Sequence, residues 1–241
     1  MKKTILTSVL ALSLCSCAEL QQVATQLPDL TQTGMGITNT DIAAALRQAL
    51  DKGIDDQVTK LTATDGFYKN NMVKILLPEE LQKVDKTLRD IGMGNLADEG
   101  LKVLNRAAED AVKEATPIFV SAVNNITFTD AKNILMGRDN AATHYLQQRT
   151  QTQLYTKFNP VIKQSFRKVG ADKIWNNLIT KYNQVPFTQN VNPDLTDYVT
   201  NEALEGVFTM ISVEEKDIRN KVSERSTDLL RKVFALQDNK S

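Results

Sequence analysis

The sequence predicts an all-α protein: a single multi-helix domain of about eight to ten helices behind a flexible N-terminal tether. Apolar residues recur at intervals of three or four through most of the chain after residue 38, which is the spacing of helices that bury one side. Glycine and proline are sparse, at 10 and 6 of 241 residues, which argues against a turn-rich β fold. Only VKILL (73–77) has the pattern of a strand, and one strand cannot form a sheet.

The first predicted helix begins near Asn39 or Thr40, because either residue can cap it. Its apolar side consists of Ile42, Leu46, Ala49, Leu50, Ile54, Val58 and Leu61. After a turn at 64–70, Pro78 suits the first turn of a second helix. The stripe of that helix consists of Leu81, Val84, Leu88 and Ile91.

A long helix is predicted from about Asn95, with Pro117 as the point where it kinks or breaks. Its alanine-rich stripe consists of Ala97, Leu101, Leu104, Ala108, Ala111 and Ala115. A short helix follows at 127–137, where we expect Thr129 to be the cap and Gly137 the stop.

The second half of the chain contains five more helical segments. Three of them follow one another at 139–158, 159–170 and 171–183. The longest break in the pattern precedes a helix that starts at about Asp194, and a helix at 227–236 closes the domain.

The first 16 residues have the pattern of a bacterial export signal. Lys2 and Lys3 form a basic head, and Thr4–Leu14 is an apolar stretch of about 11 residues. A membrane-spanning helix needs roughly 20 apolar residues, and no second apolar run follows. We therefore expect residues 1–16 to be removed as a signal peptide.

Leu14-Cys15-Ser16-Cys17 resembles a bacterial lipobox, in which an apolar residue stands three before the modified cysteine and a small residue directly before it. Cys17 meets both demands, and Cys15 does not, because Leu14 would occupy the small position. The resemblance implies lipidation of Cys17 with diacylglyceryl and palmitate. With Ala18 next, it also implies routing to the outer membrane, where the lipid-anchored protein faces the periplasm. The alternative is ordinary signal cleavage, which would release a soluble protein that begins at Ala18.

Four segments follow from these patterns: a signal peptide at 1–16, the lipidated cysteine and tether at 17–37, the helical domain at 38–237 and a tail at 238–241. A flexible tether of about 20 residues spans roughly 25 Å on average, so it acts as a spacer from the membrane. Because lipid occupies the one cysteine of the mature chain, no disulfide can form within it.

Composition excludes several classes of function. Without Lys2 and Lys3, 27 basic residues oppose 29 acidic ones, so the net charge of −2 offers no basic field to nucleic acid. His144 is the only histidine, which excludes histidine-based metal sites, and no thiol remains for zinc. The sequence has neither a GxSxG elbow nor a glycine-rich phosphate loop. We therefore expect a protein that is not an enzyme and that binds no cofactor or metal.

Two pairs of polar residues are spaced for interaction on a helix. Asn105 and Glu109 are four residues apart, with Arg106 between them, and they form a buried polar network if this side faces inward. Such a network either fixes packing or lines a site. Glu215 and Arg219 have the same spacing, which suits an ion pair.

Loop aromatic residues and a helix start complete the set of candidates. Asp194 precedes a helix, where a capping role is favoured over calcium binding. Phe67 and Phe187 lie in loops, so we favour them over aromatic residues within helices as contacts for a ligand or partner. The candidates for a binding site or a buried polar network are Asp65, Phe67, Asn105, Arg106, Glu109, Tyr182, Asp194, Tyr198, Glu215 and Arg219.

Six stretches of the chain together resemble the bacterial family known as domain of unknown function 4197. In order, they are DGFYKNNMVKILLPEEL, LNRAAEDAV, DAKNILMGRDNAATHY, KFNPVIKQS, PDLTDYVTNEALEGVF and STDLLRKVF. The resemblance covers about Thr38 to Phe234, which is almost the whole mature domain. It implies an exported, helical protein of the cell envelope, and it implies no activity.

Three functions remain open. The first is a binding or structural module that is held at the membrane by its lipid anchor and contacts an envelope protein or peptide. The second is a carrier of an apolar small molecule, which requires an interhelical cavity of several hundred Å³. The third is a hydrolase that works with carboxylates alone, drawn from Glu109, Asp110, Glu214 and Glu215.

Overall fold

The computed structural model describes residues 36–90, 92, 94–173, 175–176, 180 and 194–238. By its internal contacts the chain divides into two units, Met1–Thr38 and Asn39–Ser241. The expected signal peptide and the Leu14–Cys17 motif lie outside the described residues. In the described part of the chain, no helix combines the length and the apolar character needed to cross a membrane.

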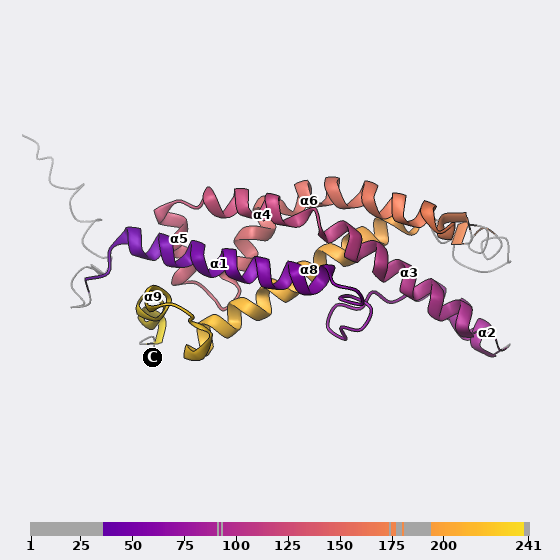
Figure 1. Cartoon of the computed structure of the whole chain (residues 1–241), viewed down its shortest axis with the longest axis horizontal. Coiled ribbons are helices and arrows are strands. Elements are labelled where there is room, and N and C mark those ends of the chain that lie inside the picture. Colours follow the sequence, from indigo (N-terminus) through magenta and orange to yellow (C-terminus); the bar gives the residue numbers. More distant parts are fainter. Residues whose placement is uncertain are drawn as a thin grey trace, which may run out of the picture. The chain divides into compact units, whose positions relative to one another are not determined.

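The described residues of the second unit form eight α-helices, one 3-10 helix and no strand, which confirms the predicted all-α class. The helices are α1 (Asn39–Thr62), α2 (Glu79–Asp90), α3 (Gly94–Val112), α4 (Ala115–Asn124), α5 (Phe128–Leu135), α6 (Ala141–Lys168), α8 (Leu195–Asn220), η1 (Val222–Glu224) and α9 (Asp228–Asp238) (Figure 1).

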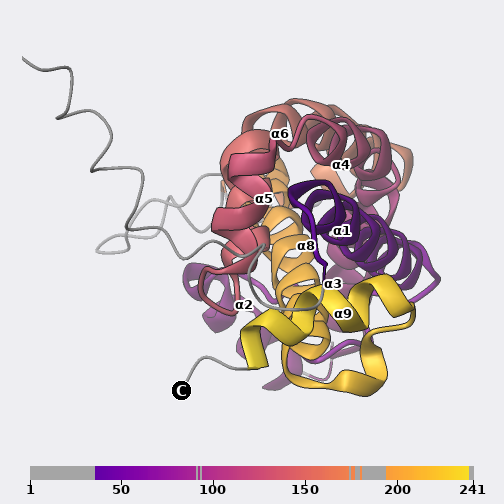
Figure 2. The ribbon, with the colours of Figure 1, turned by 90° about the vertical axis from the view of Figure 1, so that its left-hand side faces the viewer.

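Three long helices, α1, α6 and α8, make most of the contacts in this unit. Helix α8 packs against α1, α3 and α6, and α6 also packs against α3, α4 and α5 (Figures 1 and 2). Helix α1 additionally contacts α4, α5 and α9. The core therefore lies where α8 packs on its neighbours, and the rings of Phe119 of α4 and Phe208 of α8 meet edge to face with centroids 5.9 Å apart.

The apolar stripe predicted for the first helix is confirmed. Helix α1 begins at Asn39, as predicted, and every residue of the stripe is buried. The buried set is Ile42, Leu46, Ala49, Leu50, Ile54, Val58 and Leu61. Hydrophobic periodicity predicts such a helix well because its buried side is continuous along its whole length.

The long helix breaks, as predicted, but the break comes before Pro117 and not at that residue. Helix α3 ends at Val112 and α4 begins at Ala115, after a turn at Lys113 and Glu114. Pro117 is then the third residue of α4. Backbone N–H groups in the first turn of a helix have no partner within the helix, so the missing N–H of proline costs nothing there.

Helix α6 continues through Pro160, although the sequence predicts two helices that meet at this point. Proline inside a helix costs about 3 kcal/mol because it removes a hydrogen bond to the residue four positions earlier. Here Pro160 and Thr156 are both exposed, so water can satisfy the carbonyl that proline leaves unpaired. Phe158 and Ile162 are fully buried on the opposite side, and their packing holds the helix together.

The cap of α5 is Thr127 and not Thr129, the residue expected from the sequence. Thr127 Oγ1 accepts a hydrogen bond from the backbone N–H of Asp130, and Asp130 Oδ2 accepts one from the N–H of Thr127. These reciprocal bonds form a capping box, which satisfies two of the N–H groups at the helix start.

Arg225 attaches the C-terminal helix to α8. The guanidinium is buried and donates to the carbonyl oxygens of Ile218 and Arg219 at 3.1 and 2.8 Å. It also donates to both carboxylate oxygens of Asp238, and this hydrogen bond lowers the pKa of Asp238. Asp238, which is expected from the sequence to lie in the tail, is instead the last residue of α9.

Substitution of a glycine in α8 measures how closely the loop between α1 and α2 packs on that helix. A Cβ on Gly206 would stand 2.8 Å from Phe67 Cε1 and 3.3 Å from Val73 Cβ. We expect Gly206→Ala to lower the free energy of unfolding by about 1–3 kcal/mol, because the buried Phe67 ring must move. Alanine otherwise improves a helix by up to about 1 kcal/mol.

The matched control is Gly53→Ala in α1, where the added Cβ would meet the flexible Glu214 side chain at 3.1 Å. Urea denaturation should show a smaller loss, or a gain, for this variant. Equal losses for the two variants would contradict the proposed packing of Phe67.

Candidate functional site

Asn105 of α3 holds the extended segment that resembles a strand in the sequence. Its side chain is fully buried, and its Oδ1 accepts a hydrogen bond from the Ile75 N–H at 2.8 Å. Its Nδ2 donates to the carbonyl oxygens of Ile75 and Leu101, both at 2.8 Å. A carboxamide on a helix therefore does for Ile75 what a neighbouring strand would do in a sheet.

Arg106 and Glu109 extend this cluster to the start of the same loop. Glu109 Oε1 accepts the N–H of Phe67 at 3.2 Å, and Glu109 Oε2 accepts Arg106 Nη1 at 2.8 Å. Arg106 Nη2 reaches Asp65 Oδ1 at 2.7 Å, and Asp65 itself has a left-handed φ of 67°. The structure thus brings the candidates Asp65, Phe67, Asn105, Arg106 and Glu109 into one polar cluster, which fixes the loop on α3.

Phe67 lies in the core and does not face a ligand. Its side chain is fully buried, and its ring packs directly on Gly206 of α8. The expectation that a loop aromatic contacts a partner fails at this position because hydrogen bonds to the Phe67 N–H and to the Asp65 carboxylate hold the loop against α3.

Glu215 and Arg219 of α8 form the second cluster, at the junction of α5 and α6. Glu215 accepts the backbone N–H groups of Ala142 and Thr143 at 2.9 and 2.8 Å, so its carboxylate caps the start of α6. Thr143 Oγ1 also donates to Glu215 at 2.8 Å. The negative charge lies at the positive end of the α6 dipole, where it is stabilising.

Arg219 completes the junction from the other side. Its Nε donates to Glu215 Oε1 at 2.9 Å, and its two terminal nitrogens donate to the carbonyl oxygens of Leu135 and Ile134 at 3.1 and 2.9 Å. Those carbonyls end α5. The predicted pairing of Glu215 and Arg219 is confirmed, and both side chains are buried.

The carboxylates proposed for a hydrolase accept hydrogen bonds from groups of the protein itself. Glu214 accepts Gln57 Nε2 at 2.8 Å. Asp110 accepts Lys113 Nζ at 2.8 Å and Ser165 Oγ at 3.2 Å. The other two, on α3 and α8, are the acceptors of the clusters above. The hydrolase alternative therefore gains no support from the described residues.

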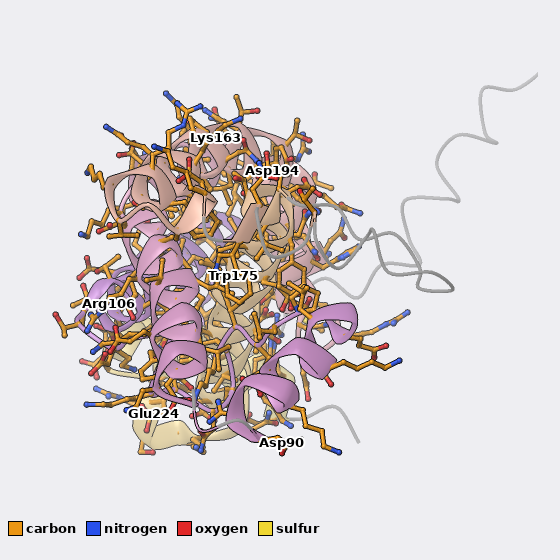
Figure 3. All side chains as sticks on the ribbon, turned by 90° about the vertical axis from the view of Figure 1, so that its right-hand side faces the viewer. Asp90, Arg106, Lys163, Trp175, Asp194 and Glu224 are labelled. Carbon is orange, nitrogen blue, oxygen red and sulfur yellow. The ribbon has the colours of Figure 1, made fainter. Side chains whose placement is uncertain are left out.

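Asp194 caps α8, which confirms the predicted capping role. Its Oδ1 accepts the N–H of Thr196 at 2.9 Å. Burial raises the pKa of Asp194, but the hydrogen bonds from Thr196 and the nearby positive charge of Lys163 outweigh it, so the pKa is lowered. Lys163 and Asp194 lie close together in Figure 3, and they line a pocket of about 200 Å³ with Trp175.

Of the three remaining aromatic candidates, one is among the described residues and two are not. Tyr198 donates its hydroxyl to the carbonyl oxygen of Leu76 at 2.9 Å, so it contacts the same extended segment that Asn105 holds. Tyr182 and Phe187 lie outside the described residues.

The pocket beside the Glu215–Arg219 pair is too small for an apolar ligand. Its volume is about 20 Å³, which is room for about one water molecule. Leu46, Leu50 and Ile218 contribute to its walls. The carrier alternative, which needs several hundred Å³, therefore gains no support from the described interior.

Larger hollows lie on the surface on both sides of α6. Three grooves border its first half, with volumes of about 480, 430 and 420 Å³. The first and third meet at Tyr145, and the first and second meet at Asn140. These volumes fall in the range of about 300–1,000 Å³ that is usual for ligand sites.

The second of these grooves, named here the α6–α8 groove, lies between two antiparallel helices. Thr143 is near Glu215 at one end, and Asn159 donates to Thr200 at 3.3 Å beyond the other end. Leu204 and Phe208 are buried below it. The lining residues are Asn140, Thr143, Gln147, Gln151, Asn201, Leu204, Glu205, Phe208, Thr209 and Ser212.

Sequence reasoning missed this groove, although the chain carries a signal for it. HYLQQRTQTQ (144–153) contains four glutamines in ten residues, an unusual density of uncharged amide groups on one helix. Periodicity marks the apolar side of a helix, so it says nothing about which polar side will be bordered by a groove.

Among the described residues, no three histidine, cysteine, aspartate or glutamate side chains gather closely enough to hold a metal ion. The fold and its sites define a helical domain whose buried charges secure loops and helix ends and whose accessible amide groups border surface grooves. The chain belongs to the family described as "Protein of unknown function (DUF4197)", whose model matches residues 36–235. Neither the curated proteins nor the solved structures contain a match to the chain.

At the junction of α5, α6 and α8, we expect substitutions of two adjacent glutamates to lower the free energy of unfolding by very different amounts. Replacement of one member of a buried ion pair leaves an uncompensated charge, so we expect Glu215→Gln to lower the free energy of unfolding by about 3–5 kcal/mol. The control Glu214→Gln should cost about 1 kcal/mol or less, because it disturbs one hydrogen bond with Gln57 at the edge of the core.

Chemical denaturation of the two variants makes the comparison. If Glu215→Gln does not fold, Glu215→Met combined with Arg219→Met should recover part of the loss, because no buried charge is left unpaired. Equal stability of the two single variants would show that the junction does not depend on this pair.

Proposed function

We propose that this chain is a lipid-anchored protein of the bacterial cell envelope, and that its helical domain binds a protein or peptide partner along α6. The family match supports the domain and leaves its activity open. The observation that carries the proposal is a contrast within the structure. Buried polar side chains such as Asn105 and Glu215 have their hydrogen bonds filled by the protein, whereas Gln147 and Gln151 border a groove with no side-chain hydrogen bond in the described residues.

The anchor is proposed at Cys17, on the resemblance of Leu14–Cys17 to a lipobox. Each buried methylene of an acyl chain contributes about 0.8 kcal/mol, and stable attachment needs more than one chain. A diacylglyceryl group with an added acyl chain meets that demand. The residues between Cys17 and the helical domain then set how far the domain can reach from the bilayer, which suits contact with an envelope partner.

No reaction is part of the proposal. The four carboxylates considered for hydrolysis are hydrogen-bonded to backbone groups or paired side chains, so they are held for structure. A binding role asks only for an accessible surface with unfilled hydrogen-bonding capacity, and the grooves along α6 supply one.

Metabolic labelling with a palmitate analogue tests the anchor. The wild-type chain and Cys15→Ser should incorporate the label, and Cys17→Ser should not, because only Cys17 has a small residue before it and an apolar residue three before it. A mature N-terminus at Ala18 in the wild-type protein, measured by mass spectrometry, would contradict lipidation.

Site-specific photocrosslinking in cells tests the binding surface. A photoreactive amino acid at Gln151 should give a discrete crosslinked product, because this position borders the α6–α8 groove. The same amino acid at Gln82, an exposed residue of α2, is the control and should not give that product. Identical products from the two positions would place the partner contact elsewhere.

A further inference from the structure

We propose that the α6–α8 groove binds a peptide in extended conformation whose basic side chain faces Glu205. The inference rests on the proposed binding function and names the ligand of that surface. Four features of the groove carry it: its chemistry, its spacing, a precedent within the protein and its charge.

The lining chemistry suits a peptide backbone. Four carboxamides line the groove, and each offers both a donor and an acceptor, as a peptide group does. The hydroxyl groups of Thr209 and Ser212 add further capacity, while Leu204 and Phe208 give the floor an apolar surface. None of the lining residues is lysine or arginine, so the groove has no group that favours a phosphate or another anion.

The spacing of the amides matches an extended chain. Gln147 and Gln151 are four residues apart on α6, which places them about 6 Å apart along the helix. Backbone groups that face the same way in a strand repeat every ~6.7 Å. From Asn140 to Gln151 the groove runs for about 16 Å along α6, a length that about five extended residues span.

The protein already contains this mode of recognition. Asn105, on helix α3, pairs its carboxamide with both the N–H and the carbonyl oxygen of Ile75 in an extended segment. That contact is buried and intramolecular. The amides on α6 have the same chemistry and also project from a helix, but they border a groove that is open to solvent.

The charge of the groove favours a particular kind of side chain on the bound peptide. Glu205 is the one charged residue in the lining, and Glu202 lies nearly one turn away on α8. Burial and, to a smaller extent, the negative charge of Glu205 raise the pKa of Glu202, so the two carboxylates repel each other. Neither carboxylate forms an ion pair with any described residue. A lysine or arginine of the ligand relieves this repulsion.

Fluorescence anisotropy with three labelled hexapeptides tests the proposal on the full chain, purified in detergent. In the peptides, serine alternates with lysine, with glutamine or with glutamate, so all the variable side chains face one way when the peptide is extended. We expect the lysine peptide to bind about tenfold more tightly than the glutamine peptide, and the glutamate peptide to bind least.

Two variants separate charge from backbone recognition. Glu205→Gln should remove the tenfold preference for lysine and leave the affinity for the glutamine peptide unchanged. Gln147→Ala combined with Gln151→Ala should weaken the lysine and glutamine peptides alike, by about tenfold or more, because amide hydrogen bonds are lost. Gln82→Ala and Glu224→Gln are the controls and should bind as the wild type does, since neither residue lines the groove. Circular dichroism checks that each variant is folded.

Three results would overturn the inference. The first is that no hexapeptide binds, and the second is that peptide binding is unchanged in the double glutamine variant. The third is that the peptides do not bind, whereas a chitin-type trisaccharide binds the wild type and not this variant. Each of these results leaves palmitate labelling and the crosslink from position 151 unaffected. Conversely, peptide binding by a chain that is never lipidated would overturn the proposed function and leave the inference standing.

Discussion

The buried ion pair between Glu215 and Arg219 is the constraint on which the arrangement of three helices depends. Each charge makes two interactions: one with the other member of the pair, and one with the end of a helix that is distant in the sequence. Glu215 neutralises the positive start of α6, and Arg219 neutralises the negative end of α5. Burying two charges costs several kcal/mol per ion, and only full hydrogen bonding offsets this cost. The pair is therefore stable in one geometry, and that geometry sets where α5 ends and α6 begins.

Once the start of α6 is set, its two sides have separate roles. The apolar side packs against α8 and α3, with Leu154, Phe158 and Ile162 fully buried. The amide-rich side borders the surface grooves. The same chemical group then has opposite roles in one protein: the carboxamide of Asn105 is consumed in holding the protein's own extended segment, whereas those of Gln147 and Gln151 remain available in the groove. This contrast is the physical basis for assigning a binding role to the domain.

Much of the fold could be predicted because helix stripes are local patterns. The seven apolar residues of α1 predicted its buried side without knowledge of its neighbours. The errors came where tertiary packing outweighed a local rule. Pro160 remains inside α6 because the buried residues on either side of it hold the helix, and Phe67 is pulled into the core because Glu109, 42 residues away, binds its N–H. Neither effect is visible in a window of a dozen residues.

The sequence by itself determined that the domain is helical, which side of α1 is buried, and that Glu215 can reach Arg219 four residues later on the same helix. Only the tertiary structure decided what those two residues hold, because Ala142 and Leu135 are 73 and 84 residues distant from their partners. It also decided which polar side chains are used up and which border a groove. Spacing along one helix is set by local geometry, whereas the supply of donors and acceptors around a side chain depends on segments that only folding brings together.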